Sequence, residues 1–454
     1  MTRVAIVGAG PAGIRAAAAL VEAGIRPVLL DEAARPGGQG YRTPSPGLDL
    51  DMAALMGSEA GHHARLHGLF AAIHDRVDYR PETLVWAVDG RTLHVATQGR
   101  AGMVAFDALL LATGATDRVV PCPGWTKPGV FTLGGAQAIL KDQGCFIGRR
   151  VAFVGSSPLL LLAALQYQSL GAHVAAVVDT TPFGAKLAAL PDLAASPRTL
   201  RRGIAYRTKL RAAGIPVHDG AAPVAIEGRD GVEGVRLRHG AREWTIACDA
   251  VALGHGLNPE TQLADLAGAQ FAYDPVFRQW LPETDADGRA GPSLYLAGDG
   301  AAIGGAYAAE ASGTLAAAAL LADHGRPQPK ATLRRLRQEV ARLRRFQRGL
   351  ARAFAWPAGQ AAALPDDATL CRCEGITAGE VRRAMAQPLG PREVNRVKAI
   401  TRVGMGRCQG RICGPALADI VAAAAGLDHA AVGRLRGQAP VKPIPLALGA
   451  EPAG

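Results

Sequence analysis

A chain of 454 residues, 49% of them hydrophobic, can form two or three domains with sizeable cores. Its formal net charge of +11 would suit a nucleic-acid-binding protein, but the charge is concentrated in one segment, so we expect no nucleic-acid partner. No apolar run is as long as a membrane span, and the first one follows Met1 too closely to leave room for a signal peptide, which favours a cytoplasmic protein, with peripheral association with the inner membrane as an alternative.

The stretch from Arg3 to Glu32 predicts a strand, a helix and a second strand in succession. Residues 4–7 and 28–30 are short apolar runs, and a helix rich in alanine and leucine begins near Pro11. The turn before the helix has the spacing Gly8-x-Gly10-x-x-Gly13. Together these features are typical of the first βαβ unit of a dinucleotide-binding fold. The alternative is a glycine-rich turn in an ordinary α/β protein.

Each residue of this glycine-rich turn and the strand end beside it can be given a part in binding a dinucleotide. Gly8 permits the tight turn, Gly10 lets the backbone approach a pyrophosphate, and Gly13 lets the helix pack closely on the strand. The helix N-terminus, which includes Pro11 and Ala12, directs unpaired N–H groups at the phosphates. Asp31 ends the second strand, where its carboxylate can accept hydrogen bonds from the adenosine ribose, and Glu32 follows it.

Three further segments are expected to lie beside this unit. A glycine-rich loop at 35–40 follows directly and is more easily explained as backbone lining a cofactor than as a neutral connector. A small-residue turn follows a buried strand at 106–111, and a carboxylate follows an apolar strand at 293–297, ahead of a helix that begins near Gly305. Such a carboxylate suits a polyhydroxyl chain, although it could simply cap the helix. The candidate residues in these segments are Gly38, Gln39, Thr113, Gly114, Gly298 and Asp299.

A second strand–helix–strand unit is predicted from Arg150 to Asp179. Its turn begins with Gly155, but Ser157 and Leu160 stand at the second and third glycine positions. Ser157 would crowd a pyrophosphate, and Leu160 would push the helix away from the strand. We therefore expect the fold of this unit to be retained and its use of a nicotinamide nucleotide to be impaired.

The positive charge is concentrated between Arg326 and Arg352, which contains nine arginines and one lysine against Glu339 alone. Apolar residues recur there at helical spacing, so the segment predicts an amphipathic helix with a solvated basic face. A docking surface for an acidic partner is the alternative. At the other end of the chain, four prolines between 434 and 454 exclude a helix. We expect this tail to be an extended arm laid on a partner rather than a disordered end.

Four of the seven cysteines are clustered near the C-terminus. Cys371 and Cys373 have the spacing Cys-x-Cys, and Cys408 and Cys413 follow after a long helical insert with the spacing Cys-x-x-x-x-Cys. Four thiolates from two short loops can ligate two bridged irons or one zinc. The neighbouring Arg372, Arg407 and Arg411 are expected to favour the thiolate form. The remaining cysteines stand alone, so a redox Cys-x-x-Cys is absent from the sequence.

The ordered set of Gly8-x-Gly10-x-x-Gly13 with Asp31, then Ala112-Thr113-Gly114, then Gly298-Asp299 resembles the two-dinucleotide-domain flavoproteins. The cysteine pattern resembles the bacterioferritin-associated-ferredoxin type of [2Fe-2S] domain. This resemblance implies an α/β fold with two Rossmann-like domains and a small helical iron–sulfur domain. FAD would bind the first domain, with its pyrophosphate on the glycines, its adenosine ribose on Asp31 and its ribityl chain on Asp299.

The resemblance also implies a domain organisation. The FAD-binding domain would comprise residues 1–125 and 256–325, with an inserted NAD(P)-binding-like domain at 126–255. A basic linker helix at 326–360, a [2Fe-2S] domain at 361–430 and an extended tail at 431–454 would follow.

The order of these modules is similar to that in the larger flavoprotein subunits of multimeric amine-oxidising dehydrogenases, a group that includes cyanide-forming glycine dehydrogenase, opine oxidase and D-hydroxyproline dehydrogenase. The sarcosine oxidase α subunit is related to them. In this group a D-amino-acid-oxidase-like subunit oxidises the amine, some members hold FMN between subunits, and a small ferredoxin-like subunit can complete the complex.

This resemblance implies an electron-transferring FAD/[2Fe-2S] subunit that passes electrons to a quinone or a carrier and has no catalytic acid or base of its own. Two alternatives stay open. The chain could be a stand-alone NAD(P)H-dependent reductase that passes electrons through its cluster. It could also be a nucleotide-sensing or scaffold protein whose cysteines hold zinc.

Overall fold

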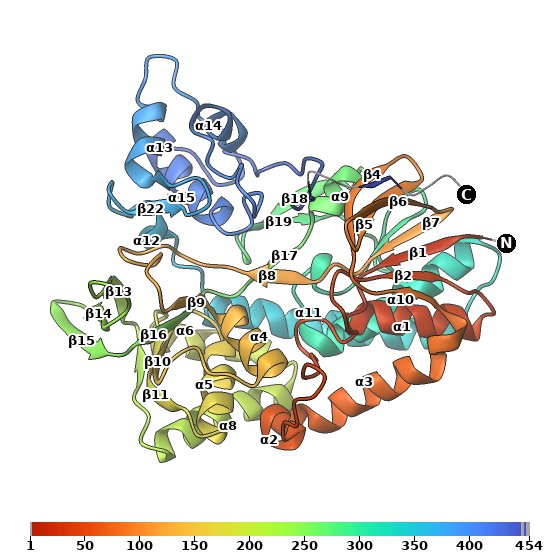
Figure 1. Cartoon of the computed structure of the whole chain (residues 1–454), viewed down its shortest axis with the longest axis horizontal. Helices are drawn as coiled ribbons and strands as arrows, with labels where there is room; N and C mark the ends of the chain where they lie inside the picture. The colour runs from red at the N-terminus through yellow and green to blue at the C-terminus, as the bar shows by residue number, and fades with distance from the viewer. Residues whose placement is uncertain (1, 446–448, 451–454) are drawn as a thin grey trace.

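The computed structural model describes residues 2–445 and 449–450, which form two α/β units and a helical C-terminal unit (Figure 1). The first unit is built on a sheet with the strand order β20-β21-β7-β1-β2-β3. All neighbours in this sheet are parallel except β20 and β21. Its strands are β1 (Val4–Val7), β2 (Val28–Leu30), β3 (Asp78–Arg80), β7 (Ala108–Leu111), β20 (Arg289–Gly291) and β21 (Leu294–Leu296).

The central strands of this sheet are buried on both faces, which explains their continuous apolar runs. On one face, Val4 and Ile6 pack in a core with helices α1 (Pro11–Glu22) and α10 (Gly305–Asp323). On the other face, Ala5 and Val7 pack against an antiparallel meander. The meander contains β4 (Thr83–Asp89), β5 (Thr92–Thr97) and β6 (Arg100–Ala105). The remaining elements of this unit are α2 (Met52–Met56), α3 (Ala60–Ile73), α9 (Gln262–Leu266), β18 (Phe271–Asp274) and β19 (Gln279–Pro282).

The second unit has a parallel sheet in the order β12-β11-β10-β16-β9 and a separate meander of β13, β14 and β15. Two short antiparallel strands, β8 (Ala115–Asp117) and β17 (Leu257–Pro259), run between the units (Figure 1). The sheet strands are β9 (Val130–Thr132), β10 (Arg150–Gly155), β11 (His173–Asp179), β12 (Val217–Asp219) and β16 (Ala250–Gly254). The meander strands are β13 (Ala222–Glu227), β14 (Gly234–His239) and β15 (Arg242–Ala247). The helices are α4 (Leu133–Gln143), α5 (Leu159–Ser169), α6 (Phe183–Ala188), α7 (Leu190–Leu193) and α8 (Pro197–Ala212).

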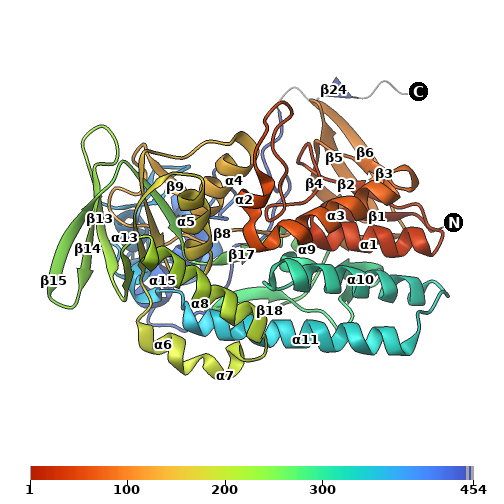
Figure 2. The same ribbon diagram turned by 90° about the horizontal axis from the view of Figure 1, so that it is seen from below.

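The predicted basic helix is α11 (Lys330–Ala353), which runs along both units (Figure 2). Its apolar side packs on each of them, because Leu336 and Val340 contact α10 residues and Phe346 lies in a core with Leu193 of α7. Most of its arginines stay exposed, with Arg344 and Arg348 half-buried, and several pair with acidic side chains of the same chain. These pairs are Arg337–Asp287, Arg348–Asp274, Arg345–Asp192 and Arg352–Asp192. The helix is therefore amphipathic as predicted, and it packs against both units over its length.

The C-terminal unit has its own apolar core, which includes Leu370, Val397, Leu417 and Ile420. Its elements are α12 (Ala358–Ala362), β22 (Thr369–Cys371), β23 (Ile376–Thr377), α13 (Ala378–Met385), α14 (Val394–Thr401) and α15 (Gly414–Ala425). The long insert between the two cysteine pairs is thus two helices, α13 and α14.

The tail turns back onto the first unit, so the expectation of an arm laid on a partner was wrong for its described part. Arg434 forms an ion pair with Asp265 at 2.7 Å, and Val441 is buried and donates its N–H to the Trp86 carbonyl at 2.9 Å. The last strand, β24 (Gly449–Ala450), pairs with β6. Residues 446–448 and 451–454, which the predicted arm also included, lie outside the described residues. The prolines explain why the tail is extended, and its contacts show that its described part packs on the chain's own first unit.

Candidate functional site

The glycines of the first turn serve different purposes. Gly8 has φ +105°, and a Cβ there would lie 2.3 Å from the Ala112 carbonyl oxygen. A Cβ on Gly13 would lie 1.8 Å from the Gly8 carbonyl oxygen. Gly10 differs, because a Cβ there would meet nothing closer than the Gly38 Cα at 3.6 Å. The chain's own packing therefore requires glycine at positions 8 and 13. At position 10 it leaves open space, which would allow a ligand to approach the backbone closely.

The N-terminus of α1 is open to an anion. Its N-cap is Gly10, which has no side chain to cap the helix, and Pro11 is the first helical residue. The first N–H groups of such a helix have no partner within the helix, so they and the helix dipole favour a negatively charged group. Gly298 lies against the same turn, because a Cβ there would be 2.9 Å from the Ala12 Cβ. The predicted residues around this helix start are thus brought together.

Asp31 supports the glycine turn from the end of β2. Its carboxylate accepts hydrogen bonds from the N–H groups of Ala9 at 2.5 Å and Ala33 at 2.7 Å. Burial raises the pKa of Asp31, and these two bonds oppose that effect. Glu32, its neighbour among the predicted cofactor residues, is exposed and forms an ion pair with Lys442 of the tail. Asp31 thus lies at the turn, whereas Glu32 is engaged elsewhere.

The glycine-rich loop lies against the first turn, as expected. The Gly37 N–H donates to the Ala9 carbonyl at 2.8 Å, and Gly38, with φ +61°, lies so close to Gly10 that a Cβ would be 3.0 Å from its Cα. The Gln39 side chain accepts a hydrogen bond from Arg42 at 2.6 Å. The backbone of the loop, rather than the Gln39 side chain, therefore faces the turn.

Asp299 occupies the end of β21 and contacts the start of α10. Its Oδ1 accepts hydrogen bonds from the N–H groups of Gly304 at 2.8 Å and Gly305 at 2.9 Å. Within the described residues no hydrogen bond reaches its other carboxylate oxygen, which leaves an acceptor for hydroxyl groups. Burial raises the pKa of Asp299. The helix-capping alternative is thus correct for one oxygen and leaves the other available.

The turn that contains Thr113 and Gly114 completes this edge. A Cβ on Gly300, next to Asp299, would lie 2.6 Å from Thr113 Oγ1. The four predicted segments therefore meet at the carboxyl end of the parallel strands β1, β2, β7 and β21, which is where open α/β sheets bind their ligands.

The corresponding edge of the second unit is built differently. Leu160 is fully buried in the core, and the Ser157 hydroxyl accepts a hydrogen bond from the Leu159 N–H at 3.2 Å. Asp179, at the end of β11, forms an ion pair with Lys186 at 2.8 Å, and Lys186 also pairs with Asp219 at 2.9 Å. The acid that would face a nucleotide ribose is therefore held by a lysine of the same chain.

The four C-terminal cysteines converge as two pairs. The thiol of Cys371 interacts chiefly with that of Cys413, and the thiol of Cys373 with that of Cys408, while Cys413 also interacts electrostatically with Cys373 and Cys408. Cys371 ends β22 and Cys413 precedes α15, and both are buried, while the other two are half-buried. No three His, Cys, Asp or Glu side chains in the described part of the chain are preassembled around one point. Two thiols for each of two irons fit this arrangement.

Two of the three arginines expected to favour the thiolates, Arg372 and Arg411, have other partners. Arg372 lies over the Trp125 ring at 5.7 Å, and Arg411 forms an ion pair with Glu260. The pKa of Cys371 is lowered to about 6 chiefly by the hydrogen bond from Cys413, and then by backbone N–H groups of the cysteine loops. The glycines of these loops are also constrained by packing, because a Cβ on Gly406 would lie 2.3 Å from the Cys373 Cβ.

The remaining cysteines lie elsewhere. Cys122 and Cys248 are buried in a core of the second unit, and Cys145 is exposed.

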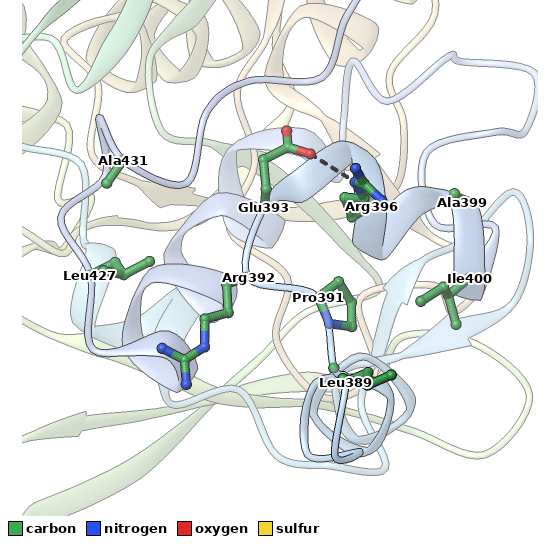
Figure 3. Close-up of a pocket in the computed structure, with 10 residues that line it drawn as sticks. Leu389, Pro391, Arg392, Glu393, Arg396, Ala399, Ile400, Leu427 and Ala431 are labelled. Carbon is green, nitrogen blue, oxygen red and sulfur yellow. Dashed lines mark hydrogen bonds between the residues drawn. The ribbon is translucent and has the colours of Figure 1, made fainter.

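A shallow pocket on the C-terminal unit is separate from both sites (Figure 3). It lies around α14 and the loops beside it, and the residues proposed for the cofactors do not line it. Leu389 and Ile400 at its rim are 98% and 62% exposed.

Residues 2–317 match the family described as pyridine nucleotide-disulphide oxidoreductase, and residues 369–423 match the BFD-like [2Fe-2S] binding domain. The chain belongs to the pyridine nucleotide-disulphide oxidoreductase family of flavin-dependent enzymes and carries a C-terminal BFD-like [2Fe-2S] binding domain. These two assignments imply FAD and a [2Fe-2S] cluster as its cofactors. The open edge at Gly10 and the paired thiols fit these groups.

Similar proteins extend over nearly the whole chain. It is 38% identical to an opine oxidase subunit from Agrobacterium tumefaciens (strain Ach5), over 97% of this chain and 90% of the relative. It is 34% identical to the HcnB subunit of hydrogen cyanide synthase from Pseudomonas aeruginosa, over 98% of this chain and 97% of that one. Among solved structures, L-proline dehydrogenase from P. horikoshii has the same fold, with a TM-score of 0.71 and 21% identity over 98% of this chain and 79% of that one.

The helices in the described ranges are too short or too polar to span a bilayer. None of them combines the required length with sufficient apolar character.

Proposed function

We propose that this chain is the electron-transferring FAD/[2Fe-2S] subunit of a heteromeric dehydrogenase or oxidase that acts on the CH–NH group of an amino acid, an imino acid or an opine. The observation that carries the proposal is the combination of a flavin-binding edge and two thiol pairs in one chain with a second dinucleotide unit whose ribose-facing acid, Asp179, is held by Lys186. FAD would accept an electron pair and the cluster would pass electrons singly.

In this proposal the chain's residues bind and orient the cofactors, and none acts as a catalytic acid or base. The glycine turn and the start of α1 would hold the FAD pyrophosphate, Asp31 the adenosine ribose, and the free oxygen of Asp299 the ribityl hydroxyls. Cys371, Cys373, Cys408 and Cys413 would ligate the two irons of the cluster. The full set proposed for FAD is Gly8, Gly10, Pro11, Ala12, Gly13, Asp31, Glu32, Gly38, Gln39, Thr113, Gly114, Gly298 and Asp299; Glu32 and Gln39 have the weakest support, because their side chains are engaged by Lys442 and Arg42.

The relatives are named as subunits of enzymes, which supports partner subunits for this chain; we propose the following particular partners. A D-amino-acid-oxidase-like subunit oxidises the amine, and FMN lies at the interface between subunits. A small ferredoxin-like subunit completes the complex, and a quinone or a carrier receives the electrons. Peripheral association of the complex with the inner membrane would accompany a quinone acceptor.

The response to NADH separates this proposal from a stand-alone NAD(P)H reductase. We expect micromolar NADH to leave the flavin absorbance of the purified chain unchanged. The reason is that Asp179 is already held in an ion pair with Lys186, and that Leu160 stands in place of the third glycine. The reassembled complex should instead bleach its flavin on addition of the amine. Rapid anaerobic bleaching of the isolated chain by NADH or NADPH, followed at the flavin absorption band, would favour the reductase.

Removal of the Asp299 carboxylate should weaken FAD binding. A hydrogen bond to a charged group contributes roughly 1.5–3 kcal/mol, so Asp299→Ala should raise the Kd for FAD about ten-fold or more. Asp299→Asn is the matched control, because its amide oxygen can still accept from Gly304 and Gly305 and so keep the start of α10 in place. Titration of the apoprotein with FAD, followed by flavin fluorescence, measures both. Equal affinities of the Ala variant and the wild type would count against the assignment.

A further inference from the structure

Glu260 lies at the junction between the proposed flavin edge and the C-terminal unit. It follows β17, its N–H donates to the Gly114 carbonyl at 2.9 Å, and its carbonyl accepts from Thr113 Oγ1 at 2.5 Å. Gly300, beside Asp299, packs on the same group, because a Cβ there would lie 3.5 Å from the Glu260 carbonyl oxygen. The backbone of Glu260 is thus joined directly to the turn that faces the flavin.

The carboxylate of Glu260 points the other way, into the loop that carries two cysteines. Arg411 stands between Cys408 and Cys413 in sequence, and its guanidinium makes a two-pronged ion pair with Glu260, one bond of which is 2.9 Å. Its Nη1 also donates to the Cys408 carbonyl at 3.2 Å and to the Val441 carbonyl at 2.7 Å. Both side chains are 9% exposed. One buried ion pair therefore connects the flavin-facing turn with the backbone of a proposed iron ligand.

A second bond reinforces this connection, since the Gln262 side chain donates to the Gln409 carbonyl at 2.8 Å. Burying two charges is costly, and such a pair is weak support for stability on its own. A two-pronged arginine–carboxylate pair does fix geometry, because both planar groups must align. The two charges also offset each other, so that the intact pair exerts little net electric field at the cluster. Neutralising one member alone would leave a net charge buried beside the cysteine loop, where water screens it poorly.

We propose that the Arg411–Glu260 pair is the positioning link between the two redox centres, holding the cluster loop against the flavin-facing turn and setting the potential at which the cluster accepts an electron. This inference rests on the proposed function.

The electrons balance in single steps. Reduced FAD carries two electrons, whereas the cluster takes one, which reduces one ferric ion to ferrous. Two successive transfers would reoxidise the flavin, which would release its protons to solvent. The cluster would pass each electron on before the next arrives, either to a one-electron carrier protein or to a quinone that takes up two electrons and two protons in all.

Redox titration of the cluster, followed by EPR on the full-length holoprotein, tests the proposal. Glu260→Gln leaves Arg411 uncompensated, so the reduced cluster is stabilised and its midpoint potential should rise. Arg411→Gln leaves Glu260 uncompensated, so the potential should fall. The double variant restores the balance and should return close to the wild-type value. Arg337→Gln is the control: it breaks the pair between the exposed Arg337 of α11 and Asp287, neither of which belongs to the flavin-facing turn or the cysteine loop, so it should leave the potential unchanged.

Arg411→Lys provides a second measurement that does not depend on the charge variants folding. It keeps the charge but loses the planar fork, so the potential should stay near wild type while electron redistribution from photoreduced flavin to the cluster becomes slower. Single-variant shifts of the same sign, no shift at all, or an unaltered rate in Arg411→Lys would overturn the proposal. Iron, sulfide and FAD contents are measured on every sample, because a wild-type chain that lacks the cluster contradicts the proposed function, whereas loaded variants with unchanged potentials contradict only the link.

Discussion

Replacement of any one of the four C-terminal cysteines by serine is expected to abolish the [2Fe-2S] centre. Wild-type protein purified anaerobically should contain about two irons and two sulfides per chain, the composition of the cluster, and give an EPR signal after dithionite reduction. Each single variant should lose both. The reason is geometric: the thiols form two pairs, and loss of one leaves an iron with a single protein sulfur. The variants are Cys371→Ser, Cys373→Ser, Cys408→Ser and Cys413→Ser.

Cys145→Ser is the matched control, because this thiol is also a free cysteine but is exposed and belongs to the second unit. It should retain full iron, sulfide and EPR signal. Stoichiometric zinc without sulfide in the wild type would remove the electron-relay function and leave a flavoprotein with a structural metal site. Retention of the cluster by any of the four serine variants would show that the ligand set is wrong.

Gly10→Ala is expected to weaken FAD binding while the protein remains folded. The added Cβ would meet only ordinary van der Waals contact with the protein, at 3.6 Å from the Gly38 Cα, and the backbone of Gly10 is extended with φ −80°. The methyl group would instead occupy the space proposed for the pyrophosphate. Overpacking of this kind costs about 1–3 kcal/mol, which corresponds to a Kd for FAD raised roughly five- to 150-fold. Fluorescence titration of the apoprotein measures the affinity, and thermal unfolding of the same sample measures the fold.

Two variants bracket this result. Gly40→Ala lies in the neighbouring loop with nothing within 4 Å of its Cβ, so it should bind FAD as the wild type does. Gly13→Ala would place a Cβ 1.8 Å from the Gly8 carbonyl oxygen, so it should destabilise the apoprotein itself. If Gly10→Ala binds FAD with unchanged affinity, the pyrophosphate does not lie over this turn.

Much of the architecture was predictable because it depends on local pattern. The apolar runs at 4–7 and 28–30, the helix between them and the order of the glycines predicted the first unit, and parallel strands bring their carboxyl ends to one edge of a sheet. The damaged turn at Ser157 and Leu160 was visible in the same way. The cysteine spacing predicted the ligand set, since two close pairs in short loops can meet at one site.

Other features were beyond local pattern because they join residues far apart in the chain. The arginines beside the cysteines suggested thiolate stabilisation. Arg411, however, is paired with Glu260, which is distant in sequence and lies outside the C-terminal unit, beside the turn that contains Thr113 and Gly114. Likewise, α11 had to be amphipathic, but the acidic partners of its arginines are distributed over two units. Side-chain charge is evident from sequence, whereas the direction in which a long side chain points depends on packing.

The sequence by itself determined the dinucleotide-binding unit, the acid at the end of its second strand and the four thiols, because turns that need glycine and spacings that suit a metal are local requirements. Only the tertiary structure decided that Asp31 accepts a hydrogen bond from the Ala9 N–H and that the tail packs on the first unit. It also decided two ion pairs, Lys186 with Asp179 and Arg411 with Glu260. The physical reason is that a buried charge must find a partner, and which partner lies within reach is set by how the units pack.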